Sequence, residues 1–165
     1  MLRIAIITLS DRASRGEYED KTGPALKALL EQKLGGDSIR LEVIPDEAST
    51  LEHLIKQLAD IEGYDLIVTN GSTGVSPRDI APEALLAVIE RRLPGFEEEM
   101  RRVSREITIK AIISRAVCGI RANTLIISVP GSPKGAVENL GALLGAIPHA
   151  IDKIKGDPSE CAGAN

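Results

Sequence analysis

The chain has 165 residues, of which 43% are hydrophobic and 27% are charged, a composition typical of one globular domain and not of a disordered chain. Its net charge of −4 offers no basic face to a phosphate backbone, and two tyrosines and one phenylalanine are too few to stack nucleobases, so nucleic acid is not an expected partner. No apolar run approaches the 18 residues of a membrane span. Met1 leads into an apolar stretch without the basic segment and cleavage site of a signal peptide.

The cysteine and histidine content is low. Cys118 and Cys161 are too few for a disulfide framework or a zinc knuckle; we expect Cys118 to be a small buried hydrophobe and Cys161 to lie in a polar tail. His53 and His149 have no neighbouring ligand residues, so a transition-metal site is not indicated. These features predict a soluble, cytoplasmic protein in a reducing compartment, with no membrane association.

Several short apolar runs predict strands. Residues 2–10 are rich in β-branched side chains, as in a strand that is buried on both faces, and residues 66–69 form a similar run. Residues 39–44 alternate between apolar and polar, which indicates a strand nearer the edge of the sheet. Residues 117–120 and 125–129 flank a turn and predict a β-hairpin.

Helical patterns lie between these runs. The predicted helices begin at Thr22, whose hydroxyl would cap the helix, at Ser49, which forms a capping box with Glu52 and leads to Ile61, at Asp79, at Phe96, and at Ala136, the last being kinked or split at Pro148. Alternating strands and helices predict a three-layer α/β/α sandwich with a mostly parallel sheet and one antiparallel hairpin strand. We expect one domain over residues 1–155 and a flexible tail over residues 156–165.

Polar clusters follow four of the predicted strands, at residues 10–12, 45–47, 70–74 and 130–135. In an open parallel sheet, ligands bind outside the carboxyl ends of the strands. If the four strands are parallel, the four clusters lie at one edge of the sheet, whereas the loops at the other edge read as plain turns. The sequence therefore predicts a ligand site at this edge.

The cluster Asn70-Gly71-Ser72-Thr73-Gly74 has two interpretations. It is a structural turn, or it is a nest of backbone N–H groups that holds a phosphate with help from the Ser72 and Thr73 hydroxyls. No Gly-Lys-Ser/Thr follows, so it is not a Walker A loop.

Two aspartates stand near this loop in the predicted sheet. Taken singly, Asp46 is a turn residue and Asp79 is a helix cap. Taken together beside a phosphate nest, they form a pair that can hold Mg²⁺. Lys134 and Arg12 either clamp further phosphate charge or are solvated. No Ser-His-Asp arrangement is visible, which disfavours covalent catalysis.

Over residues 3–155 the sequence resembles the molybdenum-cofactor biosynthesis family of the MogA/MoaB type, the molybdopterin adenylyltransferases. The resemblance rests on the order and spacing of Ser10-Asp11-Arg12, Asp20-Lys21, Pro45-Asp46-Glu47, Thr69-Asn70-Gly71-Ser72-Thr73-Gly74, Arg78-Asp79, Pro82, Pro94-Gly95-Phe96, Met100-Arg101, Ser114-Arg115 and Pro130-Gly131-Ser132-Pro133-Lys134.

This resemblance implies an adenylyl transfer, in which the terminal phosphate of molybdopterin attacks the α-phosphorus of MgATP and releases pyrophosphate. It implies catalytic, Mg²⁺-binding roles for Asp46 and Asp79. Nucleotide binding falls on Gly71, Ser72, Thr73, Gly74, Pro130, Gly131 and Ser132, and pterin binding on Ser10, Asp11, Arg12, Ser114, Arg115 and Lys134. It also implies a homotrimer or hexamer, and a separate protein that inserts molybdenum.

The sequence departs from the family pattern at Ser72, where glycine is usual. If this position needs a positive φ, serine is strained there; if not, its hydroxyl is one more donor to the nucleotide. We favour the donor, with Thr73 and Gly74 forming the sharp part of the turn. Two other functions stay open, a non-catalytic pterin- or nucleotide-binding module or scaffold, and a Mg²⁺-dependent nucleotide diphosphate hydrolase.

Overall fold

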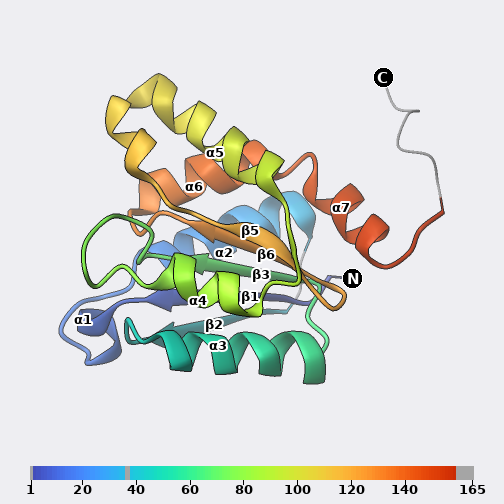
Figure 1. Cartoon of the computed structure of the whole chain (residues 1–165), viewed down its shortest axis with the longest axis horizontal. Coiled ribbons are helices and arrows are strands. Elements are labelled where there is room, and N and C mark those ends of the chain that lie inside the picture. Colours follow the sequence, from blue (N-terminus) through green and yellow to red (C-terminus); the bar gives the residue numbers. More distant parts are fainter. Residues whose placement is uncertain (1, 36–37, 159–165) are drawn as a thin grey trace.

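A computed structural model describes residues 2–35 and 38–158, which form one sheet with helices on both faces (Figure 1). The strands are β1 (Ile4–Leu9), β2 (Ile39–Ile44), β3 (Leu66–Asn70), β4 (Arg91–Arg92), β5 (Cys118–Arg121) and β6 (Thr124–Val129), in the spatial order β2-β1-β3-β6-β5-β4. β2, β1, β3 and β6 are mutually parallel, and β5 is antiparallel to both of its neighbours. The predicted fold class is confirmed, including the edge position of β2 and the hairpin of β5 and β6. The two-residue strand β4 was not predicted.

The helices divide between the two faces of the sheet. They are α1 (Asp11–Ser14), α2 (Thr22–Leu34), α3 (Ala48–Lys56) with a π-helical turn η1 (Gln57–Ile61), α4 (Ala81–Val88), α5 (Pro94–Ile107), a 3-10 turn η2 (Ile109–Ile113), α6 (Pro133–Leu143) and α7 (Ile147–Ile154). α2, α5, α6 and α7 pack on one face, and α3 and α4 pack on the other (Figure 1).

The strand pleat builds two aliphatic cores from one sheet. All six residues of β1 are buried; Ile4 and Ile6 join the core beneath α2 and α6, and Ala5 and Ile7 join the core beneath α3 and α4. Cys118 is fully buried, as predicted, and burial raises the pKa of its thiol to about 12. The double-sided burial explains why the central strands read as continuous apolar runs.

The helix starts differ from the sequence-based predictions. α5 and α6 begin at Pro94 and Pro133, two and three residues before the predicted Phe96 and Ala136, and three other starts differ as follows. The carboxylate of Asp20 caps α2, because its Oδ1 accepts from the backbone N–H of Thr22 (2.9 Å) and of Gly23 (3.1 Å), so the hydroxyl of Thr22 is not the cap. Ser49 lies inside α3, whose N-cap residue is Glu47 and makes no side-chain capping bond to the helix backbone, so the predicted capping box is wrong. The helix predicted from Asp79 begins at Ala81.

Two details follow from local helix geometry. The helix predicted from Ser49 to Ile61 ends in a π-helical turn, and Ile61, the last residue of that turn, is 82% exposed. The last predicted helix is split, as expected, but the break lies before Ile147. Pro148 occupies the first turn of α7, where its missing N–H is not needed.

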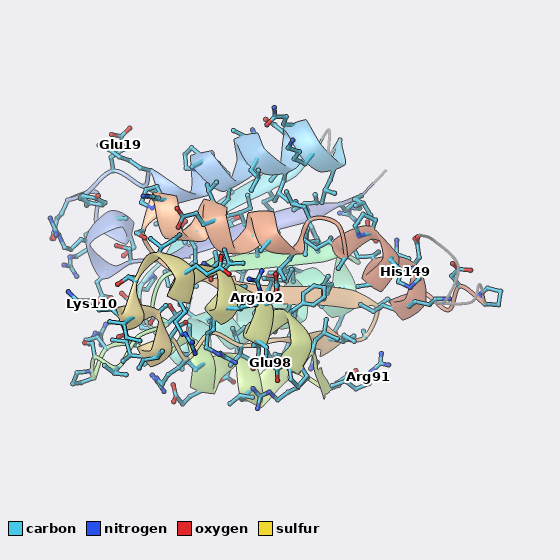
Figure 2. The ribbon with its side chains drawn as sticks, turned by 90° about the horizontal axis from the view of Figure 1, so that it is seen from above. Glu19, Arg91, Glu98, Arg102, Lys110 and His149 are labelled. Carbon is cyan, nitrogen blue, oxygen red and sulfur yellow. The ribbon has the colours of Figure 1, made fainter. Side chains whose placement is uncertain are left out.

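The two ends of the sheet have different surroundings. Figure 2 shows Glu19 and Lys110 at the end where the parallel strands finish, and His149 of α7 at the opposite end.

None of the helices within residues 2–35 and 38–158 is long and apolar enough to cross a membrane. Cys161 and most of the predicted tail lie outside the described residues.

Candidate active site

A cavity of about 300 Å³ opens at the carboxyl edge of the parallel strands, where the sequence predicts a ligand site. It brings together residues from the ends of β1, β2, β3 and β6, and we call it the carboxylate cavity. Its lining includes Thr8, Ser10, Tyr18, Asp20, Thr22, Asp46, Asn70, Gly71, Ser72, Asp79 and Gly131. Three of these side chains are carboxylates, so the cavity suits a cation or a cation-bound anion.

Asp46 and Asp79 are both anchored by backbone N–H groups. The Oδ2 atom of Asp46 accepts from the N–H of Asp11 (3.0 Å), and the N–H of Asp46 donates to Oδ1 of Asp11 (3.0 Å). Oδ2 of Asp79 accepts from the N–H of Ser76 (2.8 Å). The other oxygen of each carboxylate has no partner among the residues that the structure describes. Each aspartate is therefore held in place with one oxygen left for a ligand.

Asp11 belongs to the framework of the site. Its carboxylate accepts from the guanidinium of Arg78 at 2.5 Å (Nη2) and 3.1 Å (Nε), and this bond, with the backbone contact to Asp46, lowers the pKa of Asp11. Asp11 and Arg78 thus tie the end of β1 to the loop before α4. Arg12 lies over the ring of Tyr18, with 5.2 Å between its guanidinium carbon and the ring centroid.

Ser72 has a strained backbone, and its hydroxyl is hydrogen-bonded to other residues of the protein. Its φ is +58°, and that of Gly71 is +90°, so these two residues make the sharp part of the turn. The prediction that Thr73 and Gly74 do so is wrong. The hydroxyl of Ser72 donates to the carbonyl of Arg78 (3.2 Å) and accepts from the N–H of Ile80 (2.8 Å). Both bonds stabilise the loop, and the first uses the hydroxyl hydrogen that we favoured from the sequence as a donor to a nucleotide.

Two glycines are required by the close approach of the loops. A Cβ at Gly71 would lie 2.5 Å from the carbonyl oxygen of Leu9, and one at Gly131 would lie 3.1 Å from Cα of Gly71. The strand ends β1, β3 and β6 therefore meet backbone to backbone at this point. Both glycines are therefore needed for the packing of the protein against itself.

A second cavity, of about 390 Å³, lies on the other side of the same loops, and we call it the apolar cavity. It is formed by the end of α5, the turn η2 and the start of α6. Its lining includes Thr73, Gly74, Ser104, Ile107, Thr108, Lys110, Ala111, Ile113, Ser114, Pro130, Ser132, Lys134 and Glu138. Adjacent residues of two loops thus face different cavities: Ser72 and Gly131 line the carboxylate cavity, whereas Thr73 and Ser132 line the apolar cavity.

Most of the predicted site residues line one of the two cavities, and three do not. Asp11, Arg12 and Arg115 are absent from both linings. Arg115 instead donates to the carbonyls of Gly74 (2.7 Å) and Asp79 (2.8 Å) and pairs with Glu83, lowering the pKa of that carboxyl. It braces the loop that separates the cavities.

Sequence reasoning assigned no site role to Thr8, Asp20 or the residues of η2, and it considered Asn70 only as part of the loop at residues 70–74. Asp20 could have been found by its position three residues before Gly23-Pro24, since a carboxylate just before a helix start is a common cap. The contribution of η2 depends on long-range packing and has no local signal.

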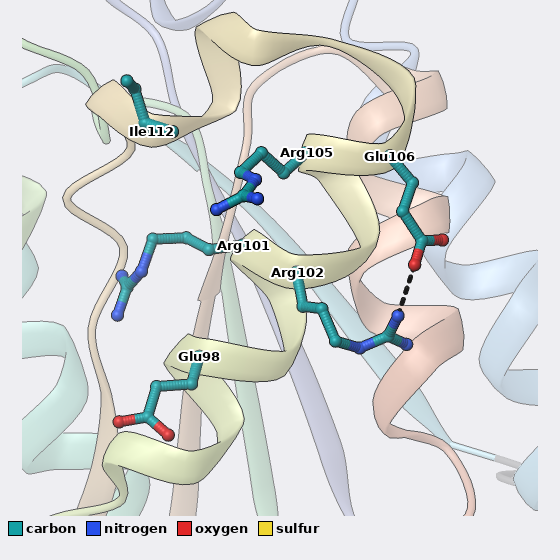
Figure 3. Close-up of a pocket in the computed structure, with 6 residues that line it drawn as sticks. All are labelled: Glu98, Arg101, Arg102, Arg105, Glu106 and Ile112. Atoms are coloured by element: carbon teal, nitrogen blue, oxygen red, sulfur yellow. Dashed lines mark hydrogen bonds and ion pairs between the residues drawn. The ribbon is translucent and has the colours of Figure 1, made fainter.

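A larger hollow, of about 620 Å³, lies on the outer side of α5 and is lined by arginine and glutamate side chains. Figure 3 shows Glu98, Arg101 and Arg105 on one side of the helix, and Arg102 bonded to Glu106 on another. None of the predicted site residues lines it. Its mixed charges are those of a solvated helix face, and the candidate active site is the pair of cavities at the sheet edge.

The fold and this edge define an α/β domain of the kind that binds ligands at the carboxyl ends of its parallel strands. The family model described as "probable molybdopterin binding domain" matches residues 5–149. The chain belongs to this family, which confirms the resemblance inferred from the sequence.

Individual relatives agree with this assignment. The chain is 41% identical to a molybdopterin adenylyltransferase of Haemophilus influenzae, over 94% of this chain and 86% of that protein. It is 37% identical to a molybdopterin adenylyltransferase of Escherichia coli, over 98% and 89% of the two chains. A crystal structure of the molybdopterin biosynthesis enzyme MoaB from Thermus thermophilus superposes with a TM-score of 0.87 at 43% identity, covering 97% of this chain and all of that one.

Proposed function

We propose that this protein is a molybdopterin adenylyltransferase, which transfers AMP from ATP to the terminal phosphate of molybdopterin and releases pyrophosphate. The observation that carries the proposal is the pair of cavities that share the loops at residues 71–74 and 130–132. One is rich in carboxylates and suits a cation-bound triphosphate; the other is largely apolar and suits a flat heterocycle. The names of the relatives that match most of the chain support the same reaction.

Mg²⁺ fits the carboxylate cavity as a companion of the triphosphate. The free oxygens of Asp46 and Asp79 are its candidate ligands. Within the described residues, no three His, Cys, Asp or Glu side chains form a metal-binding group, so phosphate oxygens and water would complete the shell, as is usual for this ion. When bound, the ion would neutralise phosphate charge, including the charge that develops on the departing pyrophosphate.

The chain itself binds and aligns the two substrates. We assign the nucleotide to the carboxylate cavity, against Gly71, Ser72 and Gly131, and the pterin to the apolar cavity, near Ser114 and Lys134. Thr73, Gly74, Pro130 and Ser132 lie at the boundary, where the two phosphate groups would meet. Holding nucleophile and α-phosphorus together converts a bimolecular step into an effectively unimolecular one, and this alignment needs no covalent enzyme intermediate.

The individual roles follow from this placement. Asp46 and Asp79 are the proposed catalytic residues through the cation. Ser10 lines the carboxylate cavity and moves from the pterin to the nucleotide side in this assignment. Asp11, Arg12 and Arg115 support the loops and are no longer assigned to the pterin.

We also propose a homotrimer, or a hexamer made of two trimers, located in the cytoplasm and working with a separate molybdenum-insertion protein. Exposed isoleucines at the end of α5 and in η2 support self-association: Ile107 (55%), Ile109 (68%), Ile112 (60%) and Ile113 (53%) are all more than half exposed. Light scattering after size-exclusion chromatography measures the mass, and a monomer of 17.6 kDa would contradict this part of the proposal.

One assay separates the proposed reaction from its rivals. The protein is incubated with MgATP and molybdopterin, and pyrophosphate and adenylylated pterin are measured. An adenylyltransferase releases pyrophosphate only when the pterin is present. A binding module releases none, and a nucleotide hydrolase releases phosphate or pyrophosphate without the pterin. Either of the last two results overturns the proposal.

A further inference from the structure

Beneath the carboxylate cavity, three polar side chains form a hydrogen-bonded chain that the proposed reaction has not used. The side-chain amide of Asn70 donates through Nδ2 to Oγ1 of Thr8 (2.9 Å) and to the carbonyl of Ile7 (3.4 Å). The hydroxyl of Thr8 in turn donates to Oδ2 of Asp20 (2.7 Å). Thr8, Asp20 and Asn70 all line the cavity.

One acceptor in this series of hydrogen bonds, Oδ1 of Asn70, has no donor among the described residues. Asn70 is 1% exposed, and its Oδ1 is buried with no hydrogen-bond partner among the described residues. Buried side-chain polar atoms are paired in the large majority of cases, so such an orphan calls for an explanation. Because Asn70 lines a polar cavity, a ligand in the cavity is the natural source of the missing donor.

The direction of every bond in the chain is set by Asp20. An ionised carboxylate can only accept, so the hydroxyl hydrogen of Thr8 must point to Asp20. Oγ1 of Thr8 can then only accept from Asn70, which forces the amide nitrogen of Asn70 toward Thr8 and leaves its oxygen free. Asp20 itself is immobilised, since its Oδ1 accepts from the first N–H groups of α2, at Thr22 and Gly23.

Gly23 makes this arrangement sterically available. A Cβ at this position would lie 2.5 Å from Oδ2 of Asp20 and 3.2 Å from Oγ1 of Thr8. The absence of a side chain lets the carboxylate lie against the helix start while it reaches Thr8.

We propose that Asp20 and Thr8 are positioning residues that hold Asn70 Oδ1 as the acceptor for a hydroxyl-type donor of the bound nucleotide, either a ribose hydroxyl or a water on its cation. This inference rests on the proposed function, which places the nucleotide in the carboxylate cavity. A neutral acceptor beside Asp46 and Asp79 adds recognition without adding repulsion to the phosphates. Both donors lie next to the phosphate groups of a nucleotide, whereas the base lies farther away.

Asp20→Asn tests the directional part of the proposal. The amide oxygen of this variant can still accept from α2, but its nitrogen now donates to Thr8. The Thr8 hydroxyl must then find another acceptor, and Asn70 Oδ1 supplies it when the Asn70 amide rotates. The free acceptor is thereby lost without deleting any side chain.

Titration calorimetry with ATP and Mg²⁺, in the absence of pterin, provides the readout. We expect Asn70→Ala and Asp20→Asn each to weaken ATP binding about 2- to 10-fold, the range of one neutral hydrogen bond. The variant with both substitutions should bind ATP no more weakly than the single variant that shows the larger loss of affinity, because Asp20 acts through Asn70. Asn139→Ala is the matched control, since Asn139 is a buried asparagine on α6 outside both cavities, and it should bind ATP as wild type does.

Two further arms identify the donor. If it is a ribose hydroxyl, the loss caused by Asn70→Ala disappears with either 2′-deoxy-ATP or 3′-deoxy-ATP. If it is a water on the cation, the loss persists with both analogues and disappears when Mg²⁺ is omitted. Thr8→Val repeats the measurement by an isosteric route if thermal melting shows that Asn70→Ala is not folded.

The proposal is overturned if Asn70→Ala binds ATP as tightly as wild type, if its loss persists both with the two analogues and without Mg²⁺, or if the losses of the two single variants add in the double variant. A wild-type protein that binds no ATP at all would instead overturn the proposed function, so the two failures are distinguishable.

Discussion

Replacing Ser72 by glycine restores the residue that the family usually has, and it tests whether the serine hydroxyl serves the loop or the nucleotide. The side chain accepts from the N–H of Ile80 and donates to the carbonyl of Arg78, which ties the start of the loop to the residues just before α4. The backbone of Ser72 has a φ of +58°, which L-residues other than Asn and Asp rarely adopt. Glycine removes the strain and both bonds at once.

The expected stability change is the balance of these effects. Two neutral hydrogen bonds contribute about 1–3 kcal/mol together. Relief of the left-handed backbone returns about 1–2 kcal/mol, and the added chain entropy of glycine costs about 0.5–1 kcal/mol. We therefore expect Ser72→Gly to lose about 1 kcal/mol of unfolding free energy. Ser72→Ala keeps the strain and loses both bonds, so it should lose about 2 kcal/mol.

Thermal melting ranks the three proteins. For a domain of this size, 1 kcal/mol corresponds to about 2–4 °C in Tm, so wild type should melt highest, Ser72→Gly next and Ser72→Ala lowest. ATP affinity should change by less than about twofold in Ser72→Gly, because the hydroxyl hydrogen is already used by Arg78. A rise in Tm for the glycine variant, or a large loss of ATP affinity, would refute this reasoning.

Three further predictions concern the two cavities and the sheet. Asp46→Asn and Asp79→Asn should each lower the rate of adenylyl transfer about 100-fold or more, and both variants should melt near the wild-type temperature. Asparagine can keep the anchoring bond from the backbone N–H, but it lacks the negative charge that holds the cation. Near-normal turnover of both variants in saturating Mg²⁺ would rule out the metal site. Gly71→Val should weaken ATP binding far more than Lys134→Ala does, and it should also lower Tm. The added Cβ lies 2.5 Å from the carbonyl oxygen of Leu9 and the φ of Gly71 is +90°, whereas the side chain of Lys134 is solvated. A larger loss of ATP affinity for Lys134→Ala in titration calorimetry would contradict this. Thr69→Val should raise the free energy of unfolding by up to about 1–2 kcal/mol. The Thr69 hydroxyl is buried and has no hydrogen-bond partner among the described residues, so its loss removes an unpaired polar group. A variant that unfolds at lower urea concentration than wild type would show that the hydroxyl has a hydrogen-bond partner.

The sequence by itself determined the layer architecture and the place of the site. Continuous apolar runs at β1 and β3 and the alternation at β2 report how many faces of each strand are buried, and burial is a property that residue type records directly. The edge where Asp46, Gly71 and Gly131 meet then follows from parallel topology.

Only the tertiary structure decided what each polar residue does there. Asn70 and Ser72 belong to the same predicted turn or nest in sequence, yet Asn70 presents an unpaired acceptor and Ser72 ties two parts of a loop together. The partners of Asn70, at Thr8 and Ile7, lie 62 and 63 positions away along the chain. A hydrogen bond depends on distance and direction in space to within a few tenths of an ångström, and residue spacing along the chain carries no such information across separate strands.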